Sequence, residues 1–437
     1  MLGIRSMIKV LLIGGGGRED AIGRKIVEGG ATLYCVAKNL NPSLSKISNE
    51  YKVISELDYD KILKYATEKK VDLLFVGPDP VLETPLVDMA EKSGIRVSSP
   101  SREASKIETS KEYMRGFVER NGIKGNIFSR VFTDGVEASK FITSSQMEFA
   151  VKPIGLTGGK GVKVMGSQIS TREEASRYAA EIVSRDGRVL LEEKISGEEF
   201  SLQVFSDGST ISPMPLAQDY KRALEGDRGV NTGGMGSITD SDHKLPFITA
   251  GCRDSALAIM KSIVNHMKLE GNPFKGIMYG QFMQVNGEPK IIEINARFAD
   301  PEGINVLFLL EDNLPDILFR IADSSLSNSS RFMHLATTLK YIVPSGYGEN
   351  AQPGQLDIDL SGLPENLQIY YASVSGTKEK VKMTSSRALA MISRSDSIES
   401  ASKAVEDNLW RIKGNFYVRH DIGSPEFMRE KLRRSSH

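Results

Sequence analysis

The sequence predicts a multi-domain α/β and α+β protein with a doubly wound parallel sheet at its N-terminus and an α+β domain at its C-terminus. Strand and helix patterns alternate over the first hundred residues, glycine-rich hairpins dominate the middle, and short strands accompany one long helical pattern near the end. The 437 residues amount to almost three domains of ~150 residues. We expect domains at 1–107, 108–324 (with a lid subdomain at about 130–197) and 325–437.

The composition predicts a cytoplasmic enzyme that acts on small molecules. Lys plus Arg (56) equals Asp plus Glu (56), so no net charge draws the chain toward nucleic acid or a membrane surface. No apolar stretch approaches the ~20 residues of a membrane span. Cys35 and Cys252 cannot build a disulfide framework, and the five histidines lack metal-ligand spacing. Zinc chemistry and hydrolytic triads are therefore disfavoured.

The first domain is predicted from alternating patterns. Residues 8–13 form a buried strand, Gly14 to Gly17 a turn, and a helix begins near Arg18. Residues 1–6 precede Met7 and resemble an extension. Further apolar runs and helical patterns follow in alternation, at 31–37, 59–69, 71–76, 82–93 and 95–97. Such βαβ units predict a parallel sheet.

The first glycine cluster, Gly14 to Gly17, predicts an anion site, because backbone amides and a helix N-terminus converge there. It does not fit a dinucleotide fingerprint. Glu19 stands where the third glycine belongs, and Lys38 and Asn39 stand where the ribose-binding carboxylate belongs. A small phosphorylated ligand is favoured over NAD, and a tight turn without ligand is the alternative.

A second glycine-rich loop joins strands predicted at 147–153 and 161–166. It follows Lys152 and contains Gly155, Gly158, Gly159, Lys160 and Gly161. Glycines allow the backbone to wrap phosphate oxygens, and lysines supply the positive charge that a polyphosphate needs. The loop is not a Walker A motif, because a strand follows it instead of a helix. A flexible hairpin with solvated lysines is the alternative.

A hairpin over 281–295 predicts a cation site. If it turns around Gly287, position 283 pairs with 291 and Gln281 lies opposite Glu293. Asn295 then shares the face of Glu293, while Ile292 and Ile294 point to the other side. Three oxygen donors on one face suit Mg²⁺ carrying nucleotide phosphates. A solvated sheet face is the alternative, and the polar cluster that follows (Arg297, Asp300, Pro301, Glu302) disfavours it.

Two more segments carry polar residues suited to a nucleotide or substrate. Residues 191–204 place Glu192, Glu193, Glu198 and Glu199 around a strand–loop–strand junction, where carboxylates could hold a ribose. Exposed glutamates are more often simply solvated. Residues 218–236 contain five glycines and predict a mobile active-site loop. Asp219, Lys221 and Arg222 stand at its foot, and a merely disordered loop is the alternative.

Together these features resemble the ATP-grasp ligases and, within them, the phosphoribosylamine–glycine ligase family. The resemblance spans about residues 7–423. It is carried by GGGGRED (14–20), VGPDPVLETPLVD (76–88), KPIGLTGGKGVKV (152–164), QDYKR…GVNTGGMG (218–236), EINARFADPE (293–302) and FYVRHDIG (416–423). Asp20 replaces a histidine of the family pattern and Ala299 a glycine. The departure at Asp20 leaves one contact of the phosphate loop open.

The resemblance implies ATP-dependent ligation of glycine to 5-phosphoribosylamine through glycyl phosphate, the second step of de novo purine biosynthesis, in a monomer that uses Mg²⁺ or Mn²⁺. The implied metal ligands are Gln281, Glu293 and Asn295. The implied ATP-binding residues are Lys111, Lys152, Gly158, Gly159, Lys160, Glu192, Glu193, Ile195 and Glu199. The implied substrate-binding residues are Gly15, Gly16, Gly17, Arg18, Glu19, Pro78, Asp219, Lys221, Asn231, Thr232, Gly233, Arg297 and Asp300. Arg297, Lys160 and Asp219 are the implied catalytic residues.

Three other functions compete with this one. The nearest is another ATP-grasp carboxylate–amine ligase with a different acceptor, which the GVNTGGMG block (229–236) disfavours. An NAD-linked oxidoreductase is disfavoured by the incomplete fingerprint at Glu19. A catalytically inactive nucleotide-binding regulator is disfavoured by the presence of Lys152, Lys160 and Glu293.

Overall fold

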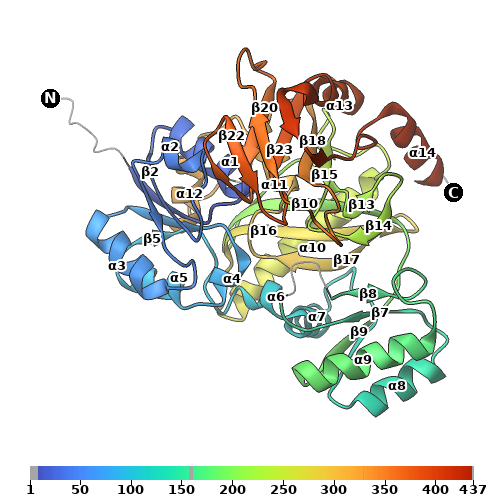
Figure 1. Cartoon of the computed structure of the whole chain (residues 1–437). Helices are drawn as coiled ribbons and strands as arrows, with labels where there is room; N and C mark the ends of the chain where they lie inside the picture. The colour runs from blue at the N-terminus through green and yellow to red at the C-terminus, as the bar shows by residue number, and fades with distance from the viewer. Residues whose placement is uncertain (1–7, 157–160, 328, 436–437) are drawn as a thin grey trace.

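The computed structural model describes residues 8–156, 161–327 and 329–435 (Figure 1). Its N-terminal part contains a five-stranded parallel sheet of order β3-β2-β1-β4-β5. The strands are β1 (Lys9–Ile13), β2 (Thr32–Ala37), β3 (Glu50–Val53), β4 (Leu73–Val76) and β5 (Arg96–Val97). The predicted parallel sheet is confirmed. Strand β3 was not predicted, because no apolar run marks it in the sequence. The segment before Met7 lies outside the described residues.

Helices connect these strands and lead out of the sheet. They are α1 (Gly17–Glu28), α2 (Leu44–Ile47), α3 (Tyr59–Lys69), α4 (Asp79–Leu82), α5 (Leu86–Lys92), α6 (Lys106–Thr109) and α7 (Lys111–Arg120). The strand order reverses between β1 and β4, so the loops after these two strands lie side by side. Such a reversal is where α/β sheets bind ligands, at the carboxyl ends of the strands.

A small α/β lobe projects from the rest of the molecule at the lower right of Figure 1. Its sheet has the order β6-β9-β7-β8 and carries two helices on one side. The elements are β6 (Ser129–Phe132), α8 (Gly135–Ser144), β7 (Phe149–Lys152), β8 (Lys163–Val164), α9 (Arg172–Asp186) and β9 (Val189–Glu193). The lobe has a hydrophobic core of its own, which includes Phe132, Phe149 and Leu191. Its bounds are close to the 130–197 predicted for a lid subdomain, so we call this lobe the lid, and its role as a lid stays a prediction.

The central sheet, of order β11-β10-β16-β17, is built from two long hairpins. Its strands are β10 (Glu198–Asp207), β11 (Ile211–Pro213), β16 (Lys275–Val285) and β17 (Glu288–Asn295). The long helix α10 (Ala250–Leu269) packs on this sheet with Met260, Ile263 and Val264 buried. The sheet supplies the floor of the site described below.

The segment 218–236 is more regular than predicted. It contains β12 (Gln218–Asp219), β13 (Arg222–Leu224) and β14 (Arg228–Asn231) and enters β15 (Gly236–Thr239). Strands β13 and β14 form a small hairpin. Its five glycines suggested a loop. Three of them have positive φ angles, and two of these, Gly226 and Gly229 at 68° and 79°, lie in the hairpin. The prediction of a loop is therefore wrong for most of the segment, and its mobility stays a prediction.

The C-terminal part contains two antiparallel sheets. The larger joins β12, β15, β18 (Ala336–Pro344), β23 (Leu389–Ser395) and β20 (Leu367–Tyr371), with β25 (Phe416–Tyr417) paired to β18. The smaller has the order β21-β22-β19-β24, from β19 (Gln355–Ile358), β21 (Val374–Gly376), β22 (Lys380–Met383) and β24 (Ile412–Gly414). The helices are α11 (Glu302–Leu309), α12 (Leu314–Ala322), α13 (Ile398–Glu406), the 3₁₀ turn Leu409–Arg411 and α14 (Pro425–Ser435). Two strands from the predicted middle domain, β12 and β15, thus belong to the C-terminal sheet.

One continuous core links the N-terminal sheet, the central sheet and the C-terminal sheet. It runs from Leu11 on β1 through Phe298 to Tyr341 on β18. The three regions therefore hold one another in a fixed arrangement, and the lid packs separately. Among the described helices, none is long and apolar enough to cross a membrane.

Candidate active site

A cleft of about 400 Å³ lies where the central sheet, the lid and the C-terminal region meet. Its polar lining comes from segments far apart in sequence. It consists of Arg18, Asp79, Glu108, Lys111, Lys152, Asp219, Lys221, Asn231, Thr232, Tyr279, Gln281, Glu293, Asn295, Arg297, Asp300, Glu302 and Arg387, with Gly233 beside them. Many charged groups of both signs thus share one partly enclosed space, an arrangement typical of an active site.

The β16–β17 hairpin places Gln281 opposite Glu293, as predicted, but by a different register. Asn286 and Gly287 form a two-residue turn, so Met283 pairs with Lys290, and the predicted pairing of 283 with 291 is wrong. A β-bulge next to Gln281 leaves Ile292 without a partner on β16. The bulge shifts the register by one residue, so that Gln281 pairs with Glu293 as predicted. Ile292 and Ile294, predicted to point to the other side of the sheet, both contribute to the lining of the cleft.

Gln281 and Glu293 meet a third polar side chain, Glu199 on β10. The Gln281 amide donates to the Glu199 carboxylate at 2.6 Å, and Lys221 approaches the same carboxylate at 3.3 Å. Burial opposes ionisation of Glu199 and Glu293, yet the nearby Lys221 charge lowers the pKa of both carboxyl groups. Both are therefore anionic at neutral pH. The Gln281 carbonyl oxygen is buried and lacks a hydrogen-bond partner in the described part of the chain.

This cluster fits a hard divalent cation. It offers two carboxylates and one unsatisfied amide oxygen, the donor types that Mg²⁺ accepts. Within residues 8–156, 161–327 and 329–435, no group of three His, Cys, Asp or Glu side chains forms a complete metal cage. Mg²⁺ usually binds through one or two carboxylates plus substrate phosphates, so an incomplete protein cage is what a nucleotide site requires. Asn295 donates to Glu293 at 3.0 Å, and its oxygen lies 3.4 Å from Arg297.

Lys152 reaches the cleft from the end of β7 and is held there by a buried carboxylate. Its ammonium lies 2.5 Å from Glu192, which also pairs with Arg115 at 2.7 Å. Burial opposes ionisation of Glu192, but the two cations lower its pKa to about 2. Glu192 does not line the cleft as described, and its contact with a nucleotide stays a prediction. It positions Lys152.

Lys111 stands next to Lys152 at the start of α7. Its ammonium donates to the Gly155 carbonyl oxygen at 2.7 Å, and burial lowers its pKa, with the Lys152 charge acting in the same direction. Two close cations that lack a full set of counter-charges form a site for an anion. Gly158, Gly159 and Lys160, predicted to complete this phosphate site, lie outside the described residues.

Arg297 enters from the segment after β17 and pairs with Glu108 on α6 at 3.1 Å. The Glu108 carboxyl also accepts from the Ala296 amide at 2.7 Å. Burial raises the pKa of Glu108 to about 7, against the effect of the Arg297 charge. The Arg297 Nε proton has no acceptor among the residues described. Arg297 thus keeps one donor for a ligand, while Glu108, which sequence patterns did not identify, holds its position.

Asp219 and Glu302 form a pair of carboxyl groups on the other side of the cleft. Burial, together with the Glu302 charge, raises the pKa of Asp219. Burial likewise raises the pKa of Glu302, whose carboxylate accepts from the Tyr279 hydroxyl at 2.9 Å. One Asp219 oxygen is buried without a hydrogen-bond partner in the described chain. Two desolvated carboxyl groups facing one space form a pocket for an ammonium group.

Arg387 joins the predicted substrate loop to the segment after β17. It pairs with Asp300 at 2.8 Å and donates to the backbone carbonyl of Gly233. Asp300 also accepts from the Tyr341 hydroxyl at 2.6 Å. Arg387 belongs to no motif, and only its position in the fold identifies it as part of the site. Asn231 and Thr232 line the same wall, as predicted.

The first glycine loop is closed by one of its own side chains. The Glu19 carboxylate accepts from the Gly16 amide at 2.8 Å and pairs with Arg18 at 2.7 Å. A Cβ added at Gly77, after β4, would lie only 2.4 Å from Glu19, so the loops after β1 and β4 converge on this carboxylate. Arg18 lines the cleft. Gly15, Gly16, Gly17, Glu19 and Pro78 do not line it as the described residues define it.

The residues predicted to bind adenine and ribose lie beside the cleft. The Glu193 carboxylate accepts from the Phe128 amide at 2.9 Å, which ties β9 to the chain before β6. Glu193, Ile195 and Glu199 do not line the cleft as described, although Glu199 contacts Gln281 inside it. Their nucleotide contacts stay predictions. Asp20, which replaces the family histidine, is buried and bonds Arg24 and the Tyr371 amide, away from the cleft.

Two family models together match most of this chain. One, described as the N domain of phosphoribosylglycinamide synthetase, matches residues 8–108. The other, described as the ATP-grasp (A) domain of phosphoribosylglycinamide synthetase, matches residues 109–303. The chain belongs to the phosphoribosylglycinamide synthetase family. A curated relative from Pyrococcus furiosus, named phosphoribosylamine–glycine ligase, is 45% identical over 429 residues, covering 98% of this chain and 97% of the relative. The family predicted from the sequence is confirmed.

Solved structures show that the chain has the ATP-grasp fold. The phosphoribosylamine–glycine ligase of Thermotoga maritima superposes with a TM-score of 0.79 at 23% identity, over 95% of this chain and 100% of that one. The biotin carboxylase domain of a Hydrogenobacter thermophilus 2-oxoglutarate carboxylase, solved with MgADP, superposes with a TM-score of 0.75 at 15% identity, over 99% and 95%. The predicted fold class is confirmed.

Replacing Glu108 tests how its burial affects stability. A carboxyl group whose pKa rises from 4.5 to about 7 on folding makes the native state hold its proton longer than the unfolded state does. The wild type should therefore lose stability relative to Glu108→Gln as the pH rises from about 5 to about 8, by about 2 to 3 kcal/mol. Denaturant unfolding at several pH values measures the difference.

The matched control is Glu103→Gln, which changes an exposed carboxylate that pairs with Lys106 at 2.7 Å. Its stability relative to wild type should stay constant over the same pH range, because surface pairs contribute little. A pH-independent difference between wild type and Glu108→Gln would contradict the raised pKa.

Proposed function

We propose that this chain ligates glycine to 5-phosphoribosylamine, converting ATP to ADP and phosphate and producing glycinamide ribonucleotide. The observation behind this assignment is that Lys111 and Lys152 share a single cleft with Glu293 and with Gln281, whose amide binds the Glu199 carboxylate. That pairing of cations for phosphates with oxygen ligands for a metal suits transfer of a phosphoryl group. Membership of the phosphoribosylglycinamide synthetase family supplies the two substrates.

The chemistry must overcome the poor leaving group of a carboxylate. A glycine carboxylate oxygen attacks the γ-phosphorus of ATP, ADP leaves, and glycyl phosphate forms. The amine of phosphoribosylamine then attacks the acyl carbon, and phosphate leaves with one oxygen of the original carboxylate. Both steps develop negative charge on phosphate oxygens, so they depend mainly on charge neutralisation and positioning.

Different cleft residues bind the phosphates, the metal ion and the glycine carboxyl group. Lys111 and Lys152 hold phosphate oxygens, and Glu192 fixes the Lys152 ammonium through its 2.5 Å contact. Mg²⁺, or Mn²⁺ in its place, would be held by Gln281, Glu293 and Asn295 together with Glu199, and would neutralise phosphate charge. Arg297, with its free Nε donor, holds the reacting carboxyl group of glycine. Lys160 is proposed as a further phosphate contact.

Asp219 receives the glycine ammonium. Its unpartnered buried oxygen and the adjacent Glu302 carboxyl lose their mutual repulsion when a cation lies between them. Asn231, Thr232 and Gly233 border the same space, and Lys221 balances the carboxylates around it. Asp300 keeps this wall in place through Arg387. An ammonium site at Asp219 and a carboxylate site at Arg297 together suit an α-amino acid, and membership of the phosphoribosylglycinamide synthetase family indicates glycine.

Arg18 is the proposed contact for the phosphate of phosphoribosylamine, because it alone of the first loop faces the cleft as described. In the structure it pairs with Glu19, so a bound phosphate would compete for its guanidinium. The amides of Gly15, Gly16 and Gly17 at the start of α1, with Pro78 nearby, complete the proposed site. Closure of the lid loop at residues 155–161 over the site would keep water from glycyl phosphate.

The proposal also includes the domain division, the oligomeric state and the localisation predicted from the sequence. The division into 1–107, 108–324 and 325–437 is supported at its first boundary by the family models, which meet at residues 108 and 109. We also propose that the chain acts as a monomer in the cytoplasm and binds no nucleic acid.

Product formation tests the proposed function. Phosphate and ADP release from MgATP should require glycine and phosphoribosylamine together, with phosphoribosylamine formed in situ from ribose 5-phosphate and ammonia. Mass spectrometry should then find glycinamide ribonucleotide. Turnover with other carboxylates or amines but not with this pair would favour a ligase with a different acceptor. Absence of ATP consumption under every condition would favour a nucleotide-binding regulator.

Glu293→Ala tests the metal site. Removing this carboxylate from the cluster should lower kcat by about a hundredfold or more, because charge neutralisation at the phosphates is lost. The matched control is Glu288→Ala, at the exposed start of the same strand, which should retain wild-type turnover. Near-normal activity of Glu293→Ala at saturating Mg²⁺ would show that the metal binds elsewhere.

A further inference from the structure

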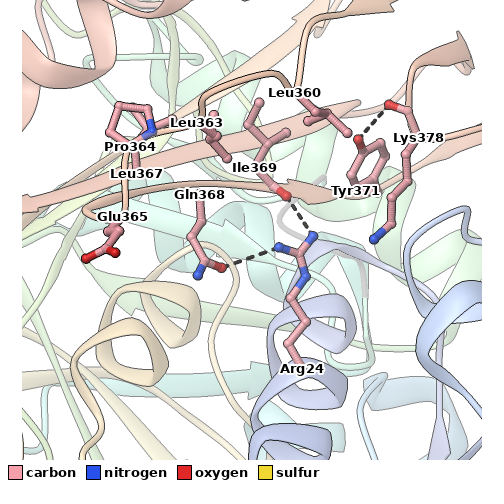
Figure 2. Close-up of a pocket in the computed structure, with 10 residues that line it drawn as sticks. All are labelled: Arg24, Leu360, Leu363, Pro364, Glu365, Leu367, Gln368, Ile369, Tyr371 and Lys378. Atoms are coloured by element: carbon pink, nitrogen blue, oxygen red, sulfur yellow. Dashed lines mark hydrogen bonds between the residues drawn. The ribbon is translucent and has the colours of Figure 1, made fainter.

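A second pocket lies between α1 and the C-terminal sheet (Figure 2). Its volume is about 350 Å³, and it shares no lining residue with the catalytic cleft. Arg24 of α1 forms one wall, and residues of the segment 360–378 form the others. Nothing in the ligation chemistry uses this space, which is large enough for a small organic molecule.

Most of the wall is apolar. Leu360, Leu363 and Pro364 come from the loop before β20, and Leu367 and Ile369 come from β20 itself. Figure 2 shows these side chains along one side of the pocket, with Glu365 at one end and Lys378 at the other. The pocket therefore combines an apolar surface with a charged group at each end.

Arg24 is fully engaged and gives the pocket a rigid base. Its guanidinium pairs with Asp20 at 2.9 Å and donates to the Ile369 carbonyl oxygen at 2.7 Å and to the Gln368 amide oxygen at 3.3 Å. It also stacks 4.5 Å from the centre of the Tyr370 ring. Asp20 neutralises the Arg24 charge, so Arg24 forms part of the pocket wall but needs no anionic ligand as a counter-charge.

Lys378 differs from Arg24, because its charge has no partner within the described residues. Its backbone carbonyl oxygen accepts from the Tyr371 hydroxyl at 2.6 Å, which fixes the residue against the pocket. Its ammonium makes no hydrogen bond or ion pair with any residue that the structure describes. Partial burial lowers its pKa, and the neighbouring Arg24 charge lowers it further. Lys46 adds another nearby positive charge, while Asp20 and Glu379 oppose it.

We propose that this pocket binds a small organic anion, a carboxylate or a phosphate monoester with an apolar body. The anionic group pairs with Lys378, and the body lies on Leu360, Leu363 and Pro364. Such a ligand supplies the counter-charge that Lys378 lacks and covers apolar surface that otherwise faces water. Glu365, at the far end of the pocket, disfavours a second anionic group there. The site is independent of the proposed ligase activity.

Lysine NMR tests the proposal on the intact protein. Lysine amines are dimethylated with ¹³C-formaldehyde, which keeps their charge, and the Lys378 signal is assigned by its absence in Lys378→Arg. Phenyl phosphate and benzoate serve as probes. Each should shift the Lys378 signal saturably and raise its pKa toward the usual lysine value. The Lys382 signal, from an exposed lysine of β22, should not move. Binding in the catalytic cleft would move the Lys111 and Lys152 signals instead.

Two comparisons identify the ligand chemistry. The probe with the lower Kd distinguishes a phosphate from a carboxylate head group. Inorganic phosphate should bind at least tenfold more weakly than phenyl phosphate, because it covers no apolar surface. Equal affinity of the two would overturn the role of the apolar wall. Failure of both organic probes to shift Lys378 saturably would overturn the site.

Variants give an independent measurement by calorimetry in the presence of saturating MgADP. Lys378→Met should weaken phenyl phosphate binding about tenfold or more, since an ionic hydrogen bond is lost. Lys382→Met should bind as the wild type does. Both variants should retain ligase turnover, which shows that they fold. Unchanged affinity in Lys378→Met would contradict the assigned contact.

Discussion

Balance of buried charge is the constraint on which the catalytic cleft depends. Arg297 pairs with Glu108, Lys152 with Glu192, and Arg387 with Asp300. The first and third pairs join different parts of the fold. Lys152 and Glu192 lie on neighbouring strands of the lid, and Arg115 of α7 reaches Glu192 from outside that lobe. Buried pairs of this kind add little net stability compared with apolar packing. Their effect is to fix where each cation points before any substrate arrives.

What the pairs leave unsatisfied defines the chemistry. The Gln281 carbonyl oxygen, one Asp219 oxygen and the Arg297 Nε proton are buried groups without partners in the described chain. An unsatisfied buried polar group costs free energy, and a ligand that satisfies it recovers that cost on binding. A metal ion, an ammonium group and a carboxylate are the three ligands that these atoms accept. MgATP and glycine together present all three.

Sequence patterns located the local parts of this site better than its long-range partners. The parallel sheet followed from apolar runs such as 8–13, and the pairing of Gln281 with Glu293 followed from the hairpin. That pairing was reached although the turn is tighter than expected, because a bulge at Ile292 compensates for it. A bulge depends on the packing of the strand, which alternation does not reveal. Glu108 and Arg387 stand in no motif, and tertiary contacts alone bring them to the cleft.

We propose that this charge-balanced cleft activates a carboxylate by transferring a phosphoryl group to it. Glycine labelled with ¹⁸O in its carboxyl group provides the most direct test. Turnover with ATP and phosphoribosylamine should deliver one labelled oxygen to each phosphate released, which mass spectrometry can count. Phosphate that carries no ¹⁸O would mean that the carboxylate never attacks the γ-phosphorus, and the assignment of the cleft to acyl phosphate chemistry would be wrong.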